Sequence, residues 1–363
     1  MSLDVWIYGP GFGESVLLIW DGLDHEANTP KRQAAFIDCF GGLRQIDHPG
    51  LVQWDKEGQP DVVLATITHP HLDHVNGAGT MLRKILQEEK LKKVLWWGGH
   101  TLRRTRKVYL HAKKNAKGVE PRGAAQMTTD FLDELVGFQD ARTAGTIAPE
   151  IDEGYELSLA YSGETSGGPI KFHAISPWEG PQTEYTQWVD AKVRAEPRKG
   201  VANATSIGFL IEYGNAQILL GGDAENPNWD ECWKALTTDE EHKNKLPPLA
   251  PCLIKVSHHG SKTGCIPGMW ESGFFRSIEK GGPPPVCVIT PWRNGSHRLP
   301  KRDVVEKISE AGCHVWETAA LDEASGIDDI TNPLGSFIQL RVDAATNRAN
   351  LENHRFCRHT PPD

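Results

Sequence analysis

The chain lacks the features that mark several large classes of protein. Its longest apolar runs, such as residues 16–20, are far shorter than the roughly 20 residues of a membrane-spanning helix, so no membrane association is expected. The sequence does not open with a basic segment followed by an apolar stretch, and no secretory leader is expected. The seven cysteines include no CxxC pair, which argues against a disulfide scaffold and against a cysteine-based zinc site. We therefore expect a cytoplasmic protein.

The chain also has fewer basic residues than acidic ones. The 39 Lys and Arg residues are outnumbered by 48 Asp and Glu residues, and the formal net charge is −9. This balance argues against a protein that coats nucleic acid non-specifically, although it leaves room for a local basic groove. Residues 103–122 form one basic stretch, which is as typical of a solvated helix surface as of a binding groove. Its first four basic residues are candidates for contact with a substrate phosphate backbone: Arg103, Arg104, Arg106 and Lys107.

What is present is the composition and patterning of a folded α/β protein. Hydrophobic residues make up 39% of the 363 residues and charged residues 24%, as in ordinary globular proteins. Residues 61–68 predict a buried strand, residues 80–90 a helix and residues 93–97 another strand, which is the alternation of a layered α/β fold. No linker divides the chain. We expect one domain over residues 1–343, with a basic insertion at about 101–165, and a polar tail over 344–363.

The segment most indicative of chemistry is residues 68–74, which read Thr-His-Pro-His-Leu-Asp-His. It places His69, His71, Asp73 and His74 directly after a predicted buried strand. Neutral imidazole and carboxylate are ligands for divalent ions such as zinc, manganese or iron. A histidine-rich surface loop is the plain alternative, but four potential ligands in one HxHxDH pattern at a strand end favour a metal site.

An HxHxDH pattern after an apolar strand resembles the metallo-β-lactamase superfamily. Three further segments match the motifs of that superfamily in order: Asp38 in FIDCFGG, Asp223 in LLGGDAE, and His258 or His259 in KVSHHGS. The resemblance implies an α/β fold, the four-layer αββα metallo-β-lactamase sandwich, in which two mixed β-sheets are flanked by helices.

Within this superfamily, the chain resembles the ComEC-type hydrolases. This subfamily comprises the hydrolase domain of the bacterial DNA-uptake channel and its stand-alone relatives. The segments that carry it are the glycine-rich opening at 11–19, residues 203–206, the HHGS block at 258–261 and a late His297, and together they cover roughly residues 5–343. The surrounding membrane channel has no counterpart here. The resemblance therefore implies a free-standing hydrolase.

By the same resemblance, the chain holds two divalent metal ions, zinc or manganese. Asp223 bridges the two ions in this scheme. The other implied ligands are His69 and His71 for the first ion, and Asp73, His74 and one of His258 and His259 for the second.

Further roles follow from the resemblance. Asp73 also orients the nucleophile, and Asp38 holds a ligand imidazole in its tautomer. Many members of the superfamily have another histidine before the bridging aspartate, whereas this chain has Asn203 in the equivalent region. Because an amide oxygen is a weaker zinc ligand than imidazole, the first site is expected to hold its ion less tightly or to favour manganese.

Four residues late in the chain are candidates for substrate contact. His297 could protonate a leaving group or bind a phosphate oxygen, or it is a plain loop histidine. Ser261 and Lys262 could contact a substrate phosphate, with an ordinary surface lysine as the alternative for Lys262. Arg293 follows a predicted strand and is a candidate residue for the rim of the site.

Three functions are open at this stage. The resemblance implies a nuclease or phosphodiesterase that cleaves DNA by attack of a hydroxide shared between the two metals. A role in a bacterial defence system, with a protein partner, is part of this hypothesis. The second hypothesis is a metallo-hydrolase of a small phosphorylated, ester or lactone metabolite, since one fold hosts many chemistries. The third is a metal-stabilised, non-catalytic subunit of a larger complex.

Overall fold

The computed structural model describes residues 2–9, 13–23, 29–40, 48–98, 101–115, 119–190, 202–237, 245–265, 283–292, 298–319, 336–355 and 357–362. Over these residues, the strands form two mixed sheets that meet at one hydrogen-bonded position, between Gly22 and Thr165. The first sheet has the order β15 (Arg348–Arg355), β14 (Phe337–Asp343), β1 (Ser2–Tyr8), β2 (Ser15–Leu23), β3 (Pro30–Ile37), β4 (Asp61–Thr66), β5 (Lys93–Trp96), β6 (Glu150–Glu153). The second has the order β7 (Ser158–Thr165), β8 (Gly168–Ala174), β9 (Phe209–Tyr213), β10 (Ala216–Leu220), β11 (Leu253–Lys255), β12 (Val286–Ile289), β13 (His314–Glu317), β16 (Arg358–Thr360).

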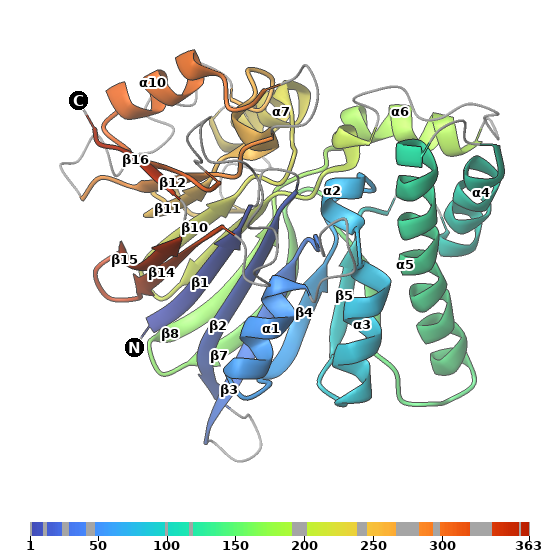
Figure 1. Cartoon of the computed structure of the whole chain (residues 1–363). Coiled ribbons are helices and arrows are strands. Elements are labelled where there is room, and N and C mark those ends of the chain that lie inside the picture. The colour runs from blue at the N-terminus through green and yellow to red at the C-terminus, as the bar shows by residue number, and fades with distance from the viewer. Residues whose placement is uncertain are drawn as a thin grey trace.

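Helices cover the outer faces of both sheets (Figure 1). Those beside the first sheet are α1 (Pro49–Lys56), α2 (Leu72–Val75), α3 (Ala78–Gln87), α4 (Leu102–Asn115) and α5 (Val119–Thr143). The others described are α6 (Glu179–Asp190), α7 (Asn226–Thr237) and α10 (Arg302–Glu310), with short 3₁₀ turns η1 (Asn203–Thr205) and η2 (Ser257–Gly260). None of these helices is long and apolar enough to cross a membrane.

Strand alternation divides the interior into three hydrophobic cores, because successive side chains of a strand point to opposite faces. In β2, Leu17 packs into the core shared with α1, α3 and α5, whereas Leu18 packs between the sheets. In β10, Ile218 also packs between the sheets, and Leu219 faces the core that contains Trp229 of α7 and Ile308 of α10. Three cores between successive layers confirm the expected four-layer αββα arrangement.

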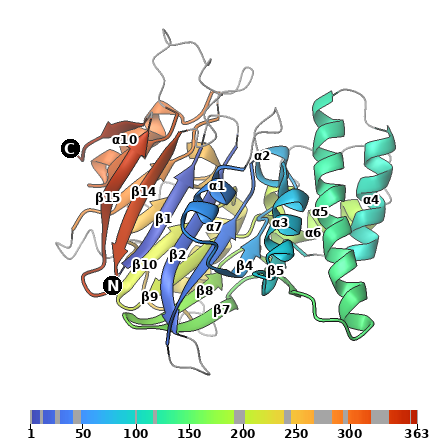
Figure 2. The ribbon, with the colours of Figure 1, turned by 60° about the horizontal axis from the view of Figure 1, so that its bottom comes forward.

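The basic stretch near the middle of the chain is helical. Its basic residues up to Lys114 lie on α4, which packs against the longer α5 at one side of the molecule (Figure 2). The later part of the expected insertion belongs to the sheets, since β6 pairs with β5 and β7 pairs with β8. Within the expected insertion, the helices α4 and α5 therefore lie outside the strand framework.

The residues after 344 are polar, as expected, but they do not form a separate tail. They supply β15, which pairs with β14, and β16, which pairs with β13. Most side chains of β15 are exposed, so the strand lacks the apolar alternation by which half-buried strands are recognised. The prediction of a tail outside the domain was wrong for this reason.

Acid should destabilise the fold through His48, which lies just before α1. Its Nδ1 accepts a hydrogen bond of 3.2 Å from the backbone N–H of Leu51, and burial lowers its pKa to about 3. The full contribution to stability is present above the ordinary pKa of 6.5 and is lost as the pH falls toward the folded pKa. Between pH 7 and pH 5 this group should remove about 2 kcal/mol from the free energy of unfolding. Urea unfolding at the two pH values measures the loss.

The matched control is His48→Asn, which keeps a capping oxygen but does not titrate. The variant should lose less stability than the wild type over the same pH interval. An equal loss in both proteins would show that other groups cause the acid sensitivity.

Candidate metal centre

The candidate ligands lie just beyond the ends of three strands. The HxHxDH segment follows β4 of the first sheet and runs into α2, while Asp223 follows β10 and His259 follows β11 of the second sheet. The two sheets therefore contribute to one site. In α/β folds, the carboxyl ends of strands are where ligands commonly bind.

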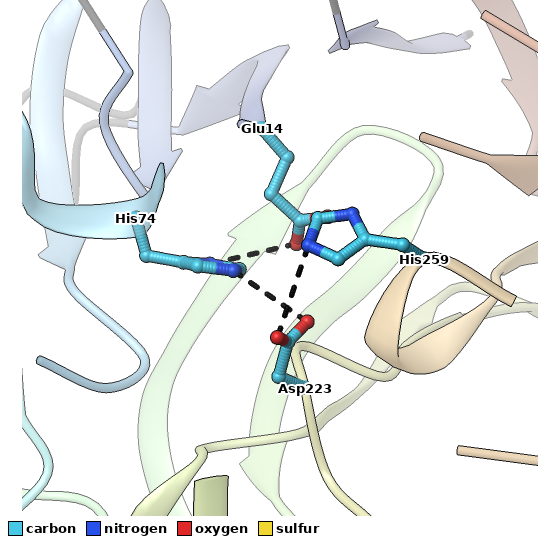
Figure 3. Close-up of side chains that lie close together, drawn as sticks. All are labelled: Glu14, His74, Asp223 and His259. Carbon is cyan, nitrogen blue, oxygen red and sulfur yellow. Dashed lines mark ion pairs between the residues drawn. The ribbon is translucent and has the colours of Figure 1, made fainter. Parts of the chain in front are cut away.

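One group of side chains joins both sheets. His74 Nε2 lies 3.5 Å from Asp73 Oδ2 and 3.5 Å from Asp223 Oδ1. His259 Nε2 lies 3.0 Å from Asp73 Oδ2 and 3.8 Å from Asp223 Oδ2. Figure 3 shows His74, Asp223 and His259 converging from their separate segments. These four side chains are the ones proposed for the second ion, with His259 as the late histidine.

A second group lies on the other side of Asp223. His69 Nε2 is 3.0 Å from His71 Nδ1 and 3.7 Å from Asp223 Oδ2. Among the described residues, two clusters could hold a metal ion, namely Glu14, His74, Asp223 and His259, and His69, His71 and Asp223. Both clusters contain Asp223. This carboxylate therefore has the position that a bridge between two ions requires.

The donor set fits divalent metal ions. Two ligand atoms about 2.1 Å from a tetrahedral ion are about 3.4 Å apart, and the separations within both groups range around this value. No described residue hydrogen-bonds to His74 Nε2 or to Asp223 Oδ1, although both atoms are buried. Buried polar atoms rarely lack a hydrogen-bond partner, and a bound cation would satisfy both of these atoms. The cluster is thus suited to divalent metal binding.

Asp38 binds the HxHxDH segment on the Nδ1 side of His74, away from the candidate ligand atom Nε2. Its carboxylate accepts hydrogen bonds from the Thr68 backbone N–H at 2.7 Å, from the Thr68 hydroxyl at 2.8 Å and from His74 Nδ1 at 2.8 Å. The last contact leaves Nε2 of His74 for the centre. Asp38 has a φ of 59°, a left-handed conformation that Asp tolerates better than most residues. Asp38 therefore lies next to a candidate ligand, His74, and holds the Thr68 backbone at the start of the HxHxDH segment.

The charges in the centre depend on one another. Burial opposes ionisation of Asp223 and Asp73, but the nearby charge of His74 outweighs it and holds the pKa of both carboxyls well below the ordinary value. Burial likewise opposes a charge on His74, yet Asp38, Asp223 and Asp73 raise its pKa well above the ordinary value. Burial lowers the pKa of His69. Because metals bind neutral imidazole, loading the centre should release a proton from His74.

His258 and His259 point to different neighbours because the backbone turns left-handed, with φ of 46° and 53°. His259 Nδ1 donates to the carbonyl of Thr290 at 2.7 Å, which leaves its Nε2 for Asp73 and Asp223. His258 Nδ1 instead lies 2.9 Å from Glu225 Oε1, outside the two clusters.

Two other predicted residues lie around His258. The hydroxyl of Ser261 lies 2.9 Å from His258 Nδ1, and the Asn203 amide nitrogen lies 3.4 Å from His258 Nε2. Asn203 Oδ1 is buried and hydrogen-bonds to no described residue. Asn203 and Ser261 therefore contact His258 beside the clusters.

The residues predicted to contact substrate are more widely spread over the structure than the candidate metal ligands. Lys262 is 66% exposed and forms an ion pair of 2.6 Å with Asp303, as a surface lysine would. On α4, Arg103 pairs with Asp140 and Arg106 with Asp133 of α5, while Arg104 and Lys107 are exposed. Arg293 and His297 lie outside the described residues.

The sequence reasoning missed two residues next to the centre. Glu14, 3% exposed, has a carboxylate oxygen within 4.8 Å of ligand atoms of His74, Asp223 and His259. It forms an ion pair with Lys255, which is 1% exposed. A lysine inside the apolar run of β11 was the available sign of a buried partner.

Comparison with known proteins adds little to this geometry. No protein-family model and no curated protein matches the chain. Among solved structures, a metallo-β-lactamase from Pontibacter korlensis is similar at 12% identity and a TM-score of 0.23, covering 73% of this chain and 80% of that chain. So low a TM-score supports no conclusion, and the fold and site rest on the layers and contacts described above.

Proposed function

We propose that this chain is a metal-dependent hydrolase of the metallo-β-lactamase superfamily, and more narrowly a ComEC-type nuclease or phosphodiesterase that cleaves DNA. One observation carries the first part: a buried His and Asp cluster in which His74 Nε2 and Asp223 Oδ1 lie 3.5 Å apart and neither atom hydrogen-bonds to a described residue. The HxHxDH and HHGS motifs support the narrower part. A protein partner in a multi-component defence system belongs to the same proposal.

The roles of the residues follow from their positions. Divalent ions in this centre would lower the pKa of water and neutralise negative charge on the group under attack. His69, His71 and Asp223 would hold one ion, and Asp73, His74, Asp223 and His259 the other. Asp73 lies at the more open edge, 12% exposed, where its carboxylate could orient the attacking water.

The charged residues on the surface of α4 provide evidence on whether the substrate is DNA or a small molecule. Lys107 is exposed on this helix and could contact a phosphate, which supports a DNA substrate. Arg103 and Arg106 pair with acids of α5, so the positive field there is weaker than the sequence implies. This pairing favours a small phosphorylated or ester substrate as the second candidate.

Incubating the protein with supercoiled plasmid and with linear single- and double-stranded DNA, in Mn²⁺, Zn²⁺ or Mg²⁺, tests the proposal. The wild type should cut DNA only with metal, and Asp73→Ala should reduce cutting by at least about 100-fold, the scale for one catalytic group. Metal content measured on the same samples confirms loading. The control variant Glu352→Ala, at an exposed position of β15, should cut like the wild type.

Failure to cut DNA by protein that contains metal would overturn the nuclease assignment. Turnover of a small phosphodiester or lactone probe by that protein would then establish the second candidate. A metal-loaded protein that hydrolyses neither kind of substrate would be a metal-stabilised subunit.

A further inference from the structure

Behind the candidate centre lies a buried ion pair that the proposed chemistry does not use. Glu14 Oε2 contacts Lys255 Nζ, and their side chains are 3% and 1% exposed. Removing two charges from water offsets most of the attraction between them, so stability of the fold alone is a weak reason for such a pair. Its contacts indicate another reason.

Glu14 faces the far edge of the ligand imidazoles. Its Oε1 lies 3.7 Å from Nδ1 of His74, and its Oε2 lies 3.7 Å from Nδ1 of His259. The Nε2 atoms of the same rings are the ones close to Asp73 and Asp223. Both Nδ1 atoms already have closer partners, at 2.8 Å and 2.7 Å. Glu14 belongs to the cluster of His74, Asp223 and His259 (Figure 3), but its carboxylate lies on the Nδ1 side of both rings, whereas Asp73 and Asp223 lie on the Nε2 side.

The pair instead connects segments that carry the ligands. The backbone N–H of Glu14 donates to the carbonyl of Asp73 at 3.1 Å. Lys255 Nζ donates to the carbonyl of Gly222 at 3.3 Å, immediately before Asp223. The contact between Glu14 and Lys255 therefore links the Asp73 loop of the first sheet to the Asp223 loop of the second.

The same carboxylate also reaches the support of His259. The Thr290 hydroxyl donates to Glu14 Oε2 at 2.6 Å, and the Thr290 carbonyl accepts from His259 Nδ1. Glu14 thus contacts, directly or through one residue, every segment that contributes to the second group of ligands.

We propose that the Glu14–Lys255 ion pair is a positioning element of the metal centre, which sets the relative positions of Asp73, Asp223 and His259 without binding metal itself. The proposal rests on the proposed function only in assuming that the centre holds metal.

Four purified variants test it: Glu14→Gln, Lys255→Met, the double variant, and Lys84→Met as a control from an exposed ion pair with Asp55. Each is stripped of metal, and its thermal unfolding is recorded. It is then titrated with Co²⁺, whose absorption spectrum reports the geometry of its ligands. Inductively coupled plasma mass spectrometry counts the ions bound.

Both single variants should bind Co²⁺ about 10–100-fold more weakly, the range for residues that hold metal ligands in place, and should unfold at lower temperature. The double variant should regain thermal stability, because no buried charge is left unpaired. It should keep the weak binding and an altered spectrum, because the link between the two loops is still missing. Lys84→Met should match the wild type.

Three results would contradict the expectation. Recovery of both stability and Co²⁺ binding in the double variant would assign the pair to the fold alone. Weak binding in Glu14→Gln with normal binding in Lys255→Met would make Glu14 a ligand. A wild-type protein that binds no Co²⁺, Zn²⁺ or Mn²⁺ would overturn the metal centre itself, which separates that failure from failure of the positioning proposal.

Discussion

Asp223→Ala should empty both halves of the metal centre and lower hydrolysis by at least about 100-fold. The reason is that Asp223 alone belongs to both clusters. Its Oδ1 lies 3.5 Å from His74 Nε2, and its Oδ2 lies 3.7 Å from His69 Nε2. With the proposed ligand assignment, each of two ions would lose a charged ligand with one substitution. The metal content of purified protein and turnover of whichever substrate it hydrolyses are the measurements.

Two comparisons sharpen this test. Asp223→Asn keeps the volume and one oxygen but removes the charge, so it should retain more metal than the alanine variant and less than the wild type. His71→Ala alters only the first cluster and should leave at least one ion bound. If Asp223→Ala still held two ions, the carboxylate would not bridge them.

Asp38→Ala should destabilise the metal-free protein by about 3 kcal/mol or more. Three buried donors lose their acceptor, namely the backbone N–H and hydroxyl of Thr68 and Nδ1 of His74, and an unsatisfied buried donor costs about 1–3 kcal/mol. Alanine also tolerates the left-handed backbone at this position less well than aspartate. Urea unfolding of metal-free protein measures the change, and metal affinity should fall about 10–100-fold as His74 loses its orientation.

Asp38→Asn separates the two effects. Asparagine accepts the left-handed conformation and can still accept from Thr68, so most of the stability should return. It presents no carboxylate to His74, so metal affinity should stay below that of the wild type. A variant with normal metal affinity would show that Asp38 serves only the fold.

The sequence allowed those parts of the site to be predicted whose residues lie close together in the chain. HxHxDH is contiguous, and the strand before it was recognisable from its β-branched apolar run, so the loop and its position at a strand end could both be predicted. Asp38 and Asp223 could be placed because their segments, FIDCFGG and LLGGDAE, resemble motifs of the metallo-β-lactamase superfamily. The layered fold followed from the same alternation of strands and helices.

Other features depend on geometry that no local pattern encodes. Adjacent histidines cannot be told apart by sequence, and only the left-handed turn sends His259 toward Asp73 and His258 toward Glu225. Glu14 and Lys255 are distant in the chain and meet only when the two sheets stack. The sequence overstated the positive charge on the surface of α4, because the acidic partners of its arginines, Asp133 and Asp140, lie on the next helix.

The pairing of β1 with β14 determines when the protein can fold during synthesis. These strands match from Ser2 with Asp343 to Tyr8 with Phe337, so one edge of β1 has no partner until the ribosome has passed residue 337. At roughly 10 residues per second, the open edge persists for roughly half a minute. The strand is apolar and buried in the finished fold, and such an edge invites pairing with other chains. Binding of the nascent chain by a chaperone would protect this edge until β14 emerges.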